Sequence, residues 1–239
     1  MKIRIKFQKY GVMKFIGHLD IMRYFQKAIR RAGIDICYSE GYSPHQIMSF
    51  AAPLGVGITS EGEYLDIEVH TSLPSAEAVA ALNDVMVDGV CIVSYRRLPD
   101  NAKTAMSLVA AADYELFFKD GYEIPAPAET FRAGLRTFFE ERDEVLVTKK
   151  TKKGEKVMDL KQLVYDFQVI EREGKPCFYL MVSTGSADNL KPELVLETLF
   201  GAMGIAYDER AIQIHRKDVY AADGEGFLSL GEMGEIIET

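Results

Sequence analysis

This chain of 239 residues has few of the residues that usually hold metals and iron–sulfur clusters. Its only cysteines, Cys37, Cys91 and Cys177, lie far apart, so it has no CxxC zinc pair, no CxxxCxxC cluster motif and no disulfide framework. Its four histidines include no HxH or HxxxH pair that would place two ligands on one element. We therefore expect no metal or cofactor, and a reducing, cytoplasmic setting.

Long apolar segments are also missing. No stretch approaches the roughly 18 apolar residues that a membrane-spanning helix needs. The basic N-terminus lacks the apolar segment of a signal peptide. We expect neither membrane insertion nor secretion.

Positive charge is scarce except in one segment. The chain has a net charge of −8, but residues 1–50 carry nine Lys and Arg against three Asp and Glu, a balance of +6. Residues 51–112 carry −5 and residues 113–239 carry −9. A basic patch on an acidic protein favours an anionic partner, because summed fields act over about 10 Å. The alternative is that these charges only solvate one face of a helix.

Residues 2–32 predict a strand followed by an amphipathic helix. In residues 2–7, Lys or Arg alternates with Ile or Phe, which is the period of a strand with one buried and one solvated face. From Leu19 to Ala32, apolar residues recur at helical spacing, and Gly33 marks the stop. The opposite face of this helix carries the basic residues Arg23, Lys27, Arg30 and Arg31.

The rest of the first hundred residues predicts a split βαβ unit. An apolar run covers residues 47–52, strands are predicted at 63–69 and 90–95, and a helix runs from Ser72 or Ser75 to Met86. The order β-α-β-β-α-β is the ferredoxin-like arrangement, in which two helices cover one face of an antiparallel sheet and the other face stays open. We place this first domain at residues 1–101.

The second half has the same predicted order of strands and helices, although its residues do not repeat those of the first half. Strands are predicted at 114–119, 164–171, 178–183 and 212–216, and helices begin near Pro127 and Pro192. We expect an α+β protein of two ferredoxin-like domains in tandem, with the second at residues 112–222. The Gly- and Glu-rich residues 223–239 are predicted to fray.

Short motifs in the first domain follow the pattern of a known bacterial family. They are Gly17-His18-Leu19-Asp20, Arg23, Arg30-Arg31-Ala32, Ser39-Glu40-Gly41-Tyr42 and Pro44-His45, with looser matches at Pro53-Leu54-Gly55 and Tyr64-Leu65-Asp66. Further support comes from the second domain, within residues 153–160. The chain resembles the radical-SAM-associated, or radical-SAM-linked, proteins, a family with a domain of unknown function. The resemblance implies a radical SAM enzyme as partner and proximity to genes of RNA processing, but no reaction. Without cluster cysteines here, radical chemistry would occur in the partner.

His18, Asp20 and Arg23 fall in the first turns of the basic helix. Helix N-termini hold phosphates because their amides have no intrahelical partners. His18 and Asp20 would then bind or polarise a phosphodiester, and Arg23 would clamp it. Alternatively, His18 is a capping or half-buried histidine and Asp20 only complements the helix dipole.

The segment from Ser39 to His45 has the composition of an ordered turn, with Gly41 and Pro44. Tyr42 offers a surface for stacking and His45 a titrating group. Such residues suit single-stranded nucleic acid, whose bases stack on aromatic rings. The alternative is that Tyr42 closes the edge of the core.

A lysine-rich segment in the second half surrounds Gly154 and predicts a hairpin tip. Its candidate contacts to nucleic acid are Lys150, Lys152 and Lys153. Lysines at such a place also prevent aggregation of an exposed sheet edge.

These observations predict an accessory protein that recognises RNA, either tRNA or rRNA and not DNA, for a partner radical SAM enzyme, with no independent activity. A second hypothesis is a protein-interaction module whose basic helix docks on an acidic surface of that enzyme. A third is a metal-independent endoribonuclease in which His18 and His45 act as base and acid. A metal site formed by His18, Asp20 and His45 is disfavoured by their spacing.

Overall fold

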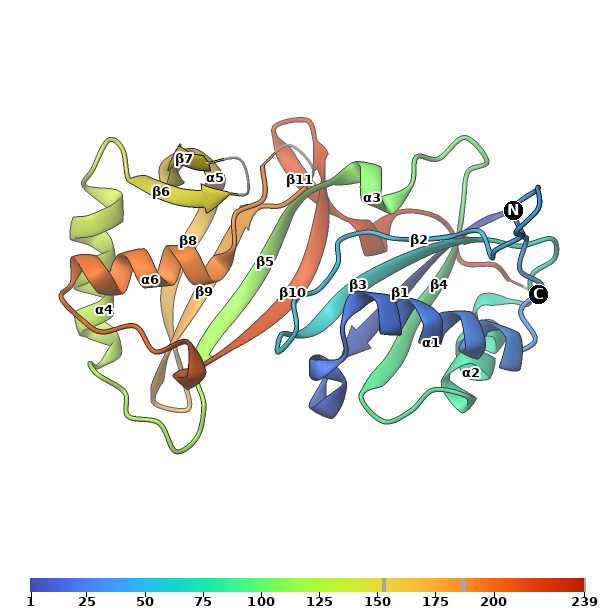
Figure 1. The fold of residues 1–239 in the computed structure, drawn as a ribbon, viewed down its shortest axis with the longest axis horizontal. Helices are drawn as coiled ribbons and strands as arrows, with labels where there is room; N and C mark the ends of the chain where they lie inside the picture. The colour runs from blue at the N-terminus through green and yellow to red at the C-terminus, as the bar shows by residue number, and fades with distance from the viewer. Residues whose placement is uncertain (152–153, 186–187, 239) are drawn as a thin grey trace. The chain divides into compact units, whose positions relative to one another are not determined.

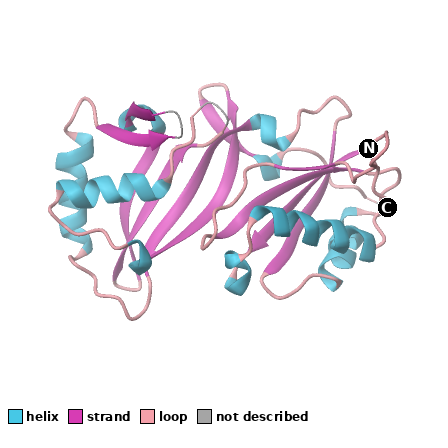
Figure 2. Ribbon diagram, viewed as in Figure 1, coloured by secondary structure: helices cyan, strands magenta, loops and turns pink. Residues whose placement is uncertain are grey.

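The computed structural model describes residues 1–151, 154–185 and 188–238. The chain divides into two compact units, the first formed by Met1–Ala111 with Arg216–Thr239 and the second by Ala112–His215. Helices and mostly antiparallel strands occur in both (Figures 1 and 2), so the mixed α and β character predicted from the sequence is confirmed. Among the described residues, no helix is long and apolar enough to cross a membrane.

The first unit begins with alternating strands and helices. Its elements are β1 (Lys2–Lys9), the 3-10 turn η1 (Gly11–Phe15), α1 (His18–Arg31), β2 (Met48–Phe50), β3 (Thr59–Glu68), α2 (Ser75–Asp84), β4 (Val90–Leu98) and α3 (Ala105–Leu108). The chain returns to this unit within β10 (Ile212–Asp223) and continues through β11 (Gly226–Ser229) and η4 (Leu230–Glu232). Strand β1 pairs antiparallel with β3 and β4, and β2 pairs antiparallel with β3. The order is therefore β4-β1-β3, with β2 and β10 both beside β3.

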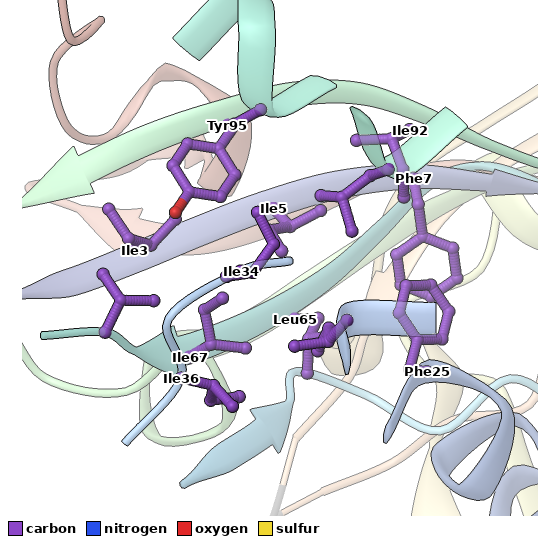
Figure 3. Packing of buried hydrophobic residues seen from close by; sticks show 14 of the residues in the cluster. Ile3, Ile5, Phe7, Phe25, Ile34, Ile36, Leu65, Ile67, Ile92 and Tyr95 are labelled. Atoms are coloured by element: carbon purple, nitrogen blue, oxygen red, sulfur yellow. The ribbon is translucent and has the colours of Figure 1, made fainter. Parts of the chain in front are cut away.

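Strand β1 contributes alternate residues to the core of this unit. Ile3, Ile5 and Phe7 are at most 2% exposed, and the Phe7 ring lies 4.7 Å from that of Phe25 in α1. Figure 3 shows Ile3, Ile5, Phe7 and Phe25 among the packed side chains of this core. Burial of each such side chain contributes about 1.5 to 3 kcal/mol. The apolar row thus holds β1 in one register.

The other face of β1 is not solvated at Arg4, contrary to the prediction from the alternating pattern. Arg4 is 2% exposed, and its Nε and Nη2 donate to the carboxylate of Asp66 at 2.8 and 2.9 Å. Asp66 lies opposite Arg4 in the β1–β3 register and also accepts the backbone N–H of Ala105 at 2.6 Å. Alternation specifies the face on which a residue lies, but not the segment that covers that face.

The C-terminal residues, predicted to fray, are packed in the first unit. Leu230 is fully buried, and Glu235 bridges to Arg97. The Ile237 N–H donates to Ser75 Oγ, and the Ser75 N–H donates to Ile237 O, both at 2.9 Å. The Gly- and Glu-rich composition of this segment favours disorder at a chain end. Its packing could not be predicted, because the partners of Glu235 and Ile237 are distant in sequence. Residues 216–222, assigned to the second domain from the sequence, also belong to this unit.

The second unit is built from the remaining elements. They are β5 (Val109–Phe118), α4 (Ala128–Leu135), the π-helical turn η2 (Arg136–Glu140), β6 (Leu146–Thr151), β7 (Gly154–Asp159), α5 (Leu160–Leu163), β8 (Val164–Arg172), β9 (Lys175–Ser183), α6 (Pro192–Ala202), η3 (Glu209–Ala211) and the first residues of β10. The strand order is β10-β5-β9-β8. In its core, the Phe131 ring lies 5.0 Å from Phe178 and 5.1 Å from Phe200.

Removal of the Asp66 carboxylate should destabilise the first unit. We expect Asp66→Ala to lower the free energy of unfolding by about 3 to 5 kcal/mol, because Arg4 would stay buried without a counter-ion. The double variant Arg4→Met/Asp66→Leu should recover most of this loss, since it leaves no buried charge. Urea denaturation followed by circular dichroism measures both changes.

Asp120→Ala is the matched control for this experiment. It removes a carboxylate that is 98% exposed and lies 2.9 Å from Lys175 Nζ. Water screens such a pair, so the stability should hardly change. Equal losses in Asp66→Ala and Asp120→Ala would contradict a structural role for the buried pair.

Candidate nucleic-acid interface

Helix α1 presents one apolar and one polar face. Gly17 at its N-cap has extended backbone and no side chain, and Gly33 after its last turn has a φ of 69°, which glycine adopts without strain. The residues that α1 buries are Ile21, Phe25, Ala28 and Ile29. Their spacing places them on one side of the helix, so its polar residues lie on the other side.

The exposed face of α1 carries a basic stripe, which we define as Arg23, Lys27 and Arg30. All three residues are exposed, as the amphipathic pattern predicts. The Arg23 guanidinium lies 3.4 Å from the Asp20 carboxylate, but both side chains are about two-thirds exposed. Water screens such a pair, so Arg23 stays available to another anion.

The segment Ser39–His45 forms a closed loop, which we call the Tyr42 loop. Its two ends are joined by the Ser39 N–H, which donates to His45 O at 2.8 Å, and by the His45 N–H, which donates to Ser39 Oγ at 3.1 Å. Gly41 has a φ of 111°, which favours glycine. Tyr42 is fully exposed and Pro44 and His45 are exposed, so Tyr42 does not close the edge of the core.

One carbonyl oxygen connects the loop to the stripe. Gln26 O accepts from Arg30 Nε at 3.2 Å and from Gln46 Nε2 at 3.1 Å. Gln46 directly follows His45 and is 5% exposed. The basic stripe and the Tyr42 loop therefore lie side by side, and we call them together the stripe–loop surface.

Two predicted site residues lie away from this surface. Arg31 points toward the end of α2, where its Nη2 donates to Val85 O at 3.0 Å. His18 is the first residue of α1, eight residues before Gln26 and thus about 12 Å along the helix axis. His18 therefore does not lie with His45, whereas Asp20 lies beside Arg23 of the stripe. In the described part of the chain, no three His, Cys, Asp or Glu side chains gather as a metal site would require.

The predicted lysine tip belongs to the second unit. Lys150 lies in β6, opposite Glu155 of β7 in the register of this hairpin. Lys152 and Lys153 lie outside the described residues. The hairpin agrees with the predicted turn near Gly154, which has a φ of 127°.

The residues that join helix and loop, Gln26 and Gln46, were missed by the sequence analysis. Gln46 buries its Oε1 without a hydrogen-bond partner among the described residues. No local pattern identifies such a glutamine, because its role depends on a carbonyl 20 residues earlier.

Comparison with known proteins identifies the family. A model of a bacterial family described as "Uncharacterized protein conserved in bacteria (DUF2344)" matches residues 2–192. The chain belongs to this family. No curated protein matches the sequence. The crystal structure of an unknown protein from Galdieria sulphuraria matches at 13% identity over 90% of this chain and 96% of that chain, with a TM-score of 0.23, which is too low to support any inference.

Loss of the Gln46 side chain should loosen the Tyr42 loop. Gln46→Ala removes the bond to Gln26 O, and we expect chymotrypsin to cleave after Tyr42 several-fold faster, because cleavage requires local opening of the loop. Mass spectrometry of the products over time measures the rate. Gln168→Ala, which removes an exposed amide 2.7 Å from Asp166, should leave this rate unchanged. If Gln46→Ala also leaves it unchanged, the bonds between Ser39 and His45 suffice to hold the loop.

Proposed function

We propose that this protein is an RNA-binding accessory protein that presents substrate RNA to a partner radical SAM enzyme. The observation that carries the RNA part is the stripe–loop surface, on which exposed basic residues and a fully exposed tyrosine lie side by side. The stripe and the loop are held side by side because Gln26 O accepts hydrogen bonds from both Arg30 and Gln46.

The two parts of the surface suit the two parts of a single-stranded RNA. Arginine and lysine side chains bind phosphates, and contacts of this kind supply most of the affinity for nucleic acid. A base that is not paired has a free π-face, which stacks on an aromatic side chain for about 1 to 3 kcal/mol. Tyr42 offers such a side chain, because its ring is fully exposed and no described residue covers it.

The radical SAM part of the proposal rests on the resemblance of the sequence motifs. Gly17-His18-Leu19-Asp20 and Ser39-Glu40-Gly41-Tyr42 are its clearest segments. In the structure these segments border the first turn of α1 and form the Tyr42 loop, so both are accessible on the first unit. We expect the partner to supply the iron–sulfur cluster and the chemistry.

We also propose that both units are ferredoxin-like. If the separate hairpin β6-β7 and the returning strands β10 and β11 of the first unit are set aside, each unit has four strands with the first between the third and the fourth: β1 lies between β3 and β4, and β5 between β9 and β10. The repeated order supports an origin of the chain as two βαββαβ units.

We do not propose that this chain cleaves RNA. A general acid and a general base must both come within hydrogen-bond reach of one phosphodiester. His18 is the first residue of α1, whereas His45 precedes Gln46, which contacts Gln26 about two turns later, and no described contact connects the two histidines. Docking of the stripe on an acidic protein surface remains the competing function, which the following test separates from RNA binding.

RNA binding should weaken steeply as salt rises. Contacts to roughly three to five phosphates give a slope of log K against log salt of about −2 to −3.5 for single strands. Arg23→Glu/Arg30→Glu should lower the affinity at least tenfold and flatten the slope, because two phosphate contacts are lost. Fluorescence anisotropy of a labelled RNA at several salt concentrations measures both.

The matched control is Lys103→Glu/Lys191→Glu, which makes the same charge change at two exposed lysines that belong to neither the stripe nor the Tyr42 loop. Its affinity should stay within about twofold of the wild type. Tyr42→Ala should weaken binding with little change in slope, since stacking releases no counterions. Absence of RNA binding at low salt, together with stripe-dependent copurification of a radical SAM enzyme, would establish the docking function instead.

A further inference from the structure

A small cavity opens beside the first turn of α1, away from the Tyr42 loop. Its volume is about 20 Å³, which suffices for one water-sized group. Its polar lining residues are Lys9, His18 and Glu63, and its apolar lining includes Phe7, Phe50, Pro53 and Leu54. The motif segments at Gly17-His18 and Pro53-Leu54 thus meet at one place that the proposed RNA surface does not use.

Lys9 occupies a position of β1 that faces the core. It continues the alternation that buries Ile5 and Phe7, and it is 3% exposed. Its ammonium donates to Ile16 O at 2.7 Å. Because an ammonium has three hydrogens, two more can be directed at a ligand. A lysine is almost never this buried without a charged partner.

The negative charge at the cavity is already engaged by another cation. The Glu63 carboxylate accepts from Nε and Nη2 of Arg216, the first of these at 2.8 Å, and both side chains are at most 6% exposed. Arg216 also donates to Ala52 O at 2.8 Å. One carboxylate therefore faces two buried cations, so Lys9, Glu63 and Arg216 together carry a charge of +1.

This excess charge is held in an apolar environment. Burial lowers the pKa of the Lys9 ammonium, Glu63 partly opposes the shift, and Arg216 reinforces it. A second negative charge beside Lys9 would favour its charged form. Such an interaction is stronger here than at an exposed site, because little water screens it.

His18 adds a second donor at the cavity. Its ring stands edge-on to Phe50, with ring centres 5.3 Å apart. Within the described residues, no hydrogen bond engages either ring nitrogen of His18. Gly17 has no side chain that caps α1, and among the described residues no hydrogen bond engages the backbone N–H of His18 or Leu19. Lys9 supplies the positive charge at the cavity, and these neutral donors add to it.

We propose that this cavity binds an oxyanion of the phosphate type, with one oxygen inserted between Lys9 and His18. The volume admits a single oxygen, so the rest of the anion lies at the mouth of the cavity. Lys9 supplies the charge, His18 a directional donor, and Phe7, Phe50 and Leu54 exclude water. The site is independent of the stripe–loop surface, and neither proposal requires the other.

Titration of the purified full-length protein with inorganic phosphate, at constant ionic strength adjusted with chloride, tests the site. We expect saturable binding by isothermal titration calorimetry. Lys9→Met should weaken it at least tenfold, because it keeps the length of the side chain and removes the charge. His18→Phe should weaken it several-fold, since a phenyl ring keeps the packing on Phe50 but donates no hydrogen bond. Lys103→Met, at an exposed lysine that belongs to neither the cavity nor the stripe–loop surface, should bind phosphate like the wild type.

Two outcomes would overturn the proposal. One is the absence of saturable binding up to millimolar phosphate. The other is a wild-type affinity for phosphate in both single variants, His18→Phe and Lys9→Met. If Lys9→Met fails to fold, the phosphate affinity of His18→Phe, compared with that of the control variant, still tests the site. No RNA is present, so failure here leaves the proposed RNA function untouched.

A second arm identifies the source of the anion. Two RNA oligonucleotides of one sequence, with a 5′-phosphate and with a 5′-hydroxyl, are compared in wild type and in Lys9→Met. Tighter binding of the phosphorylated RNA that disappears in Lys9→Met identifies an RNA end as ligand. Equal binding of the two, with phosphate binding retained, identifies free phosphate.

Discussion

The antiparallel register of β1 with β3 is the constraint on which the first unit depends. It turns Ile3 and Ile5 toward α1 and α2 and places Arg4 opposite Asp66 on the other face. A slip by one residue would exchange the two faces, which would expose the apolar row and separate the buried ion pair. Apolar burial and charge pairing therefore favour the same register. The C-terminal segment contributes because it packs Leu230 near Arg4.

The same alternation produces the charged cluster near His18. Lys9 and Glu63 have the parity of the buried rows of β1 and β3, so both face the helix side where the core ends. Burial of a charge costs free energy unless the charge is paired. Glu63 and Arg216 satisfy one another, whereas the only described bond from the ammonium of Lys9 goes to a neutral carbonyl. Incompletely paired buried charges of this kind occur at binding sites, which is the basis of the anion proposal.

Helix α1 separates two surfaces of different chemistry. Its first turn borders a recess of single-oxygen size, and its later turns carry exposed arginine and lysine side chains beside the Tyr42 loop. Long exposed cations suit a partner whose phosphates recur along a chain. A small, partly apolar recess suits one fixed anion, because little water screens the interaction there. Both surfaces belong to the first unit, which also contains most of the motifs that the sequence analysis identified.

The sequence predicted the strands and helices from β1 to β4, the two faces of α1 and its end near Gly33, because periodicity and glycine's backbone freedom act over a few residues. It predicted that Tyr42 and the stripe are candidate contacts, but not that Gln46 joins them. Only the tertiary structure separated His18 from His45, buried Arg4 and packed the C-terminal residues. Each of these results depends on a partner distant in sequence, as Arg216 is from Glu63 and Ile237 from Ser75. Local patterns specify which face a residue occupies, and only the fold specifies what covers it.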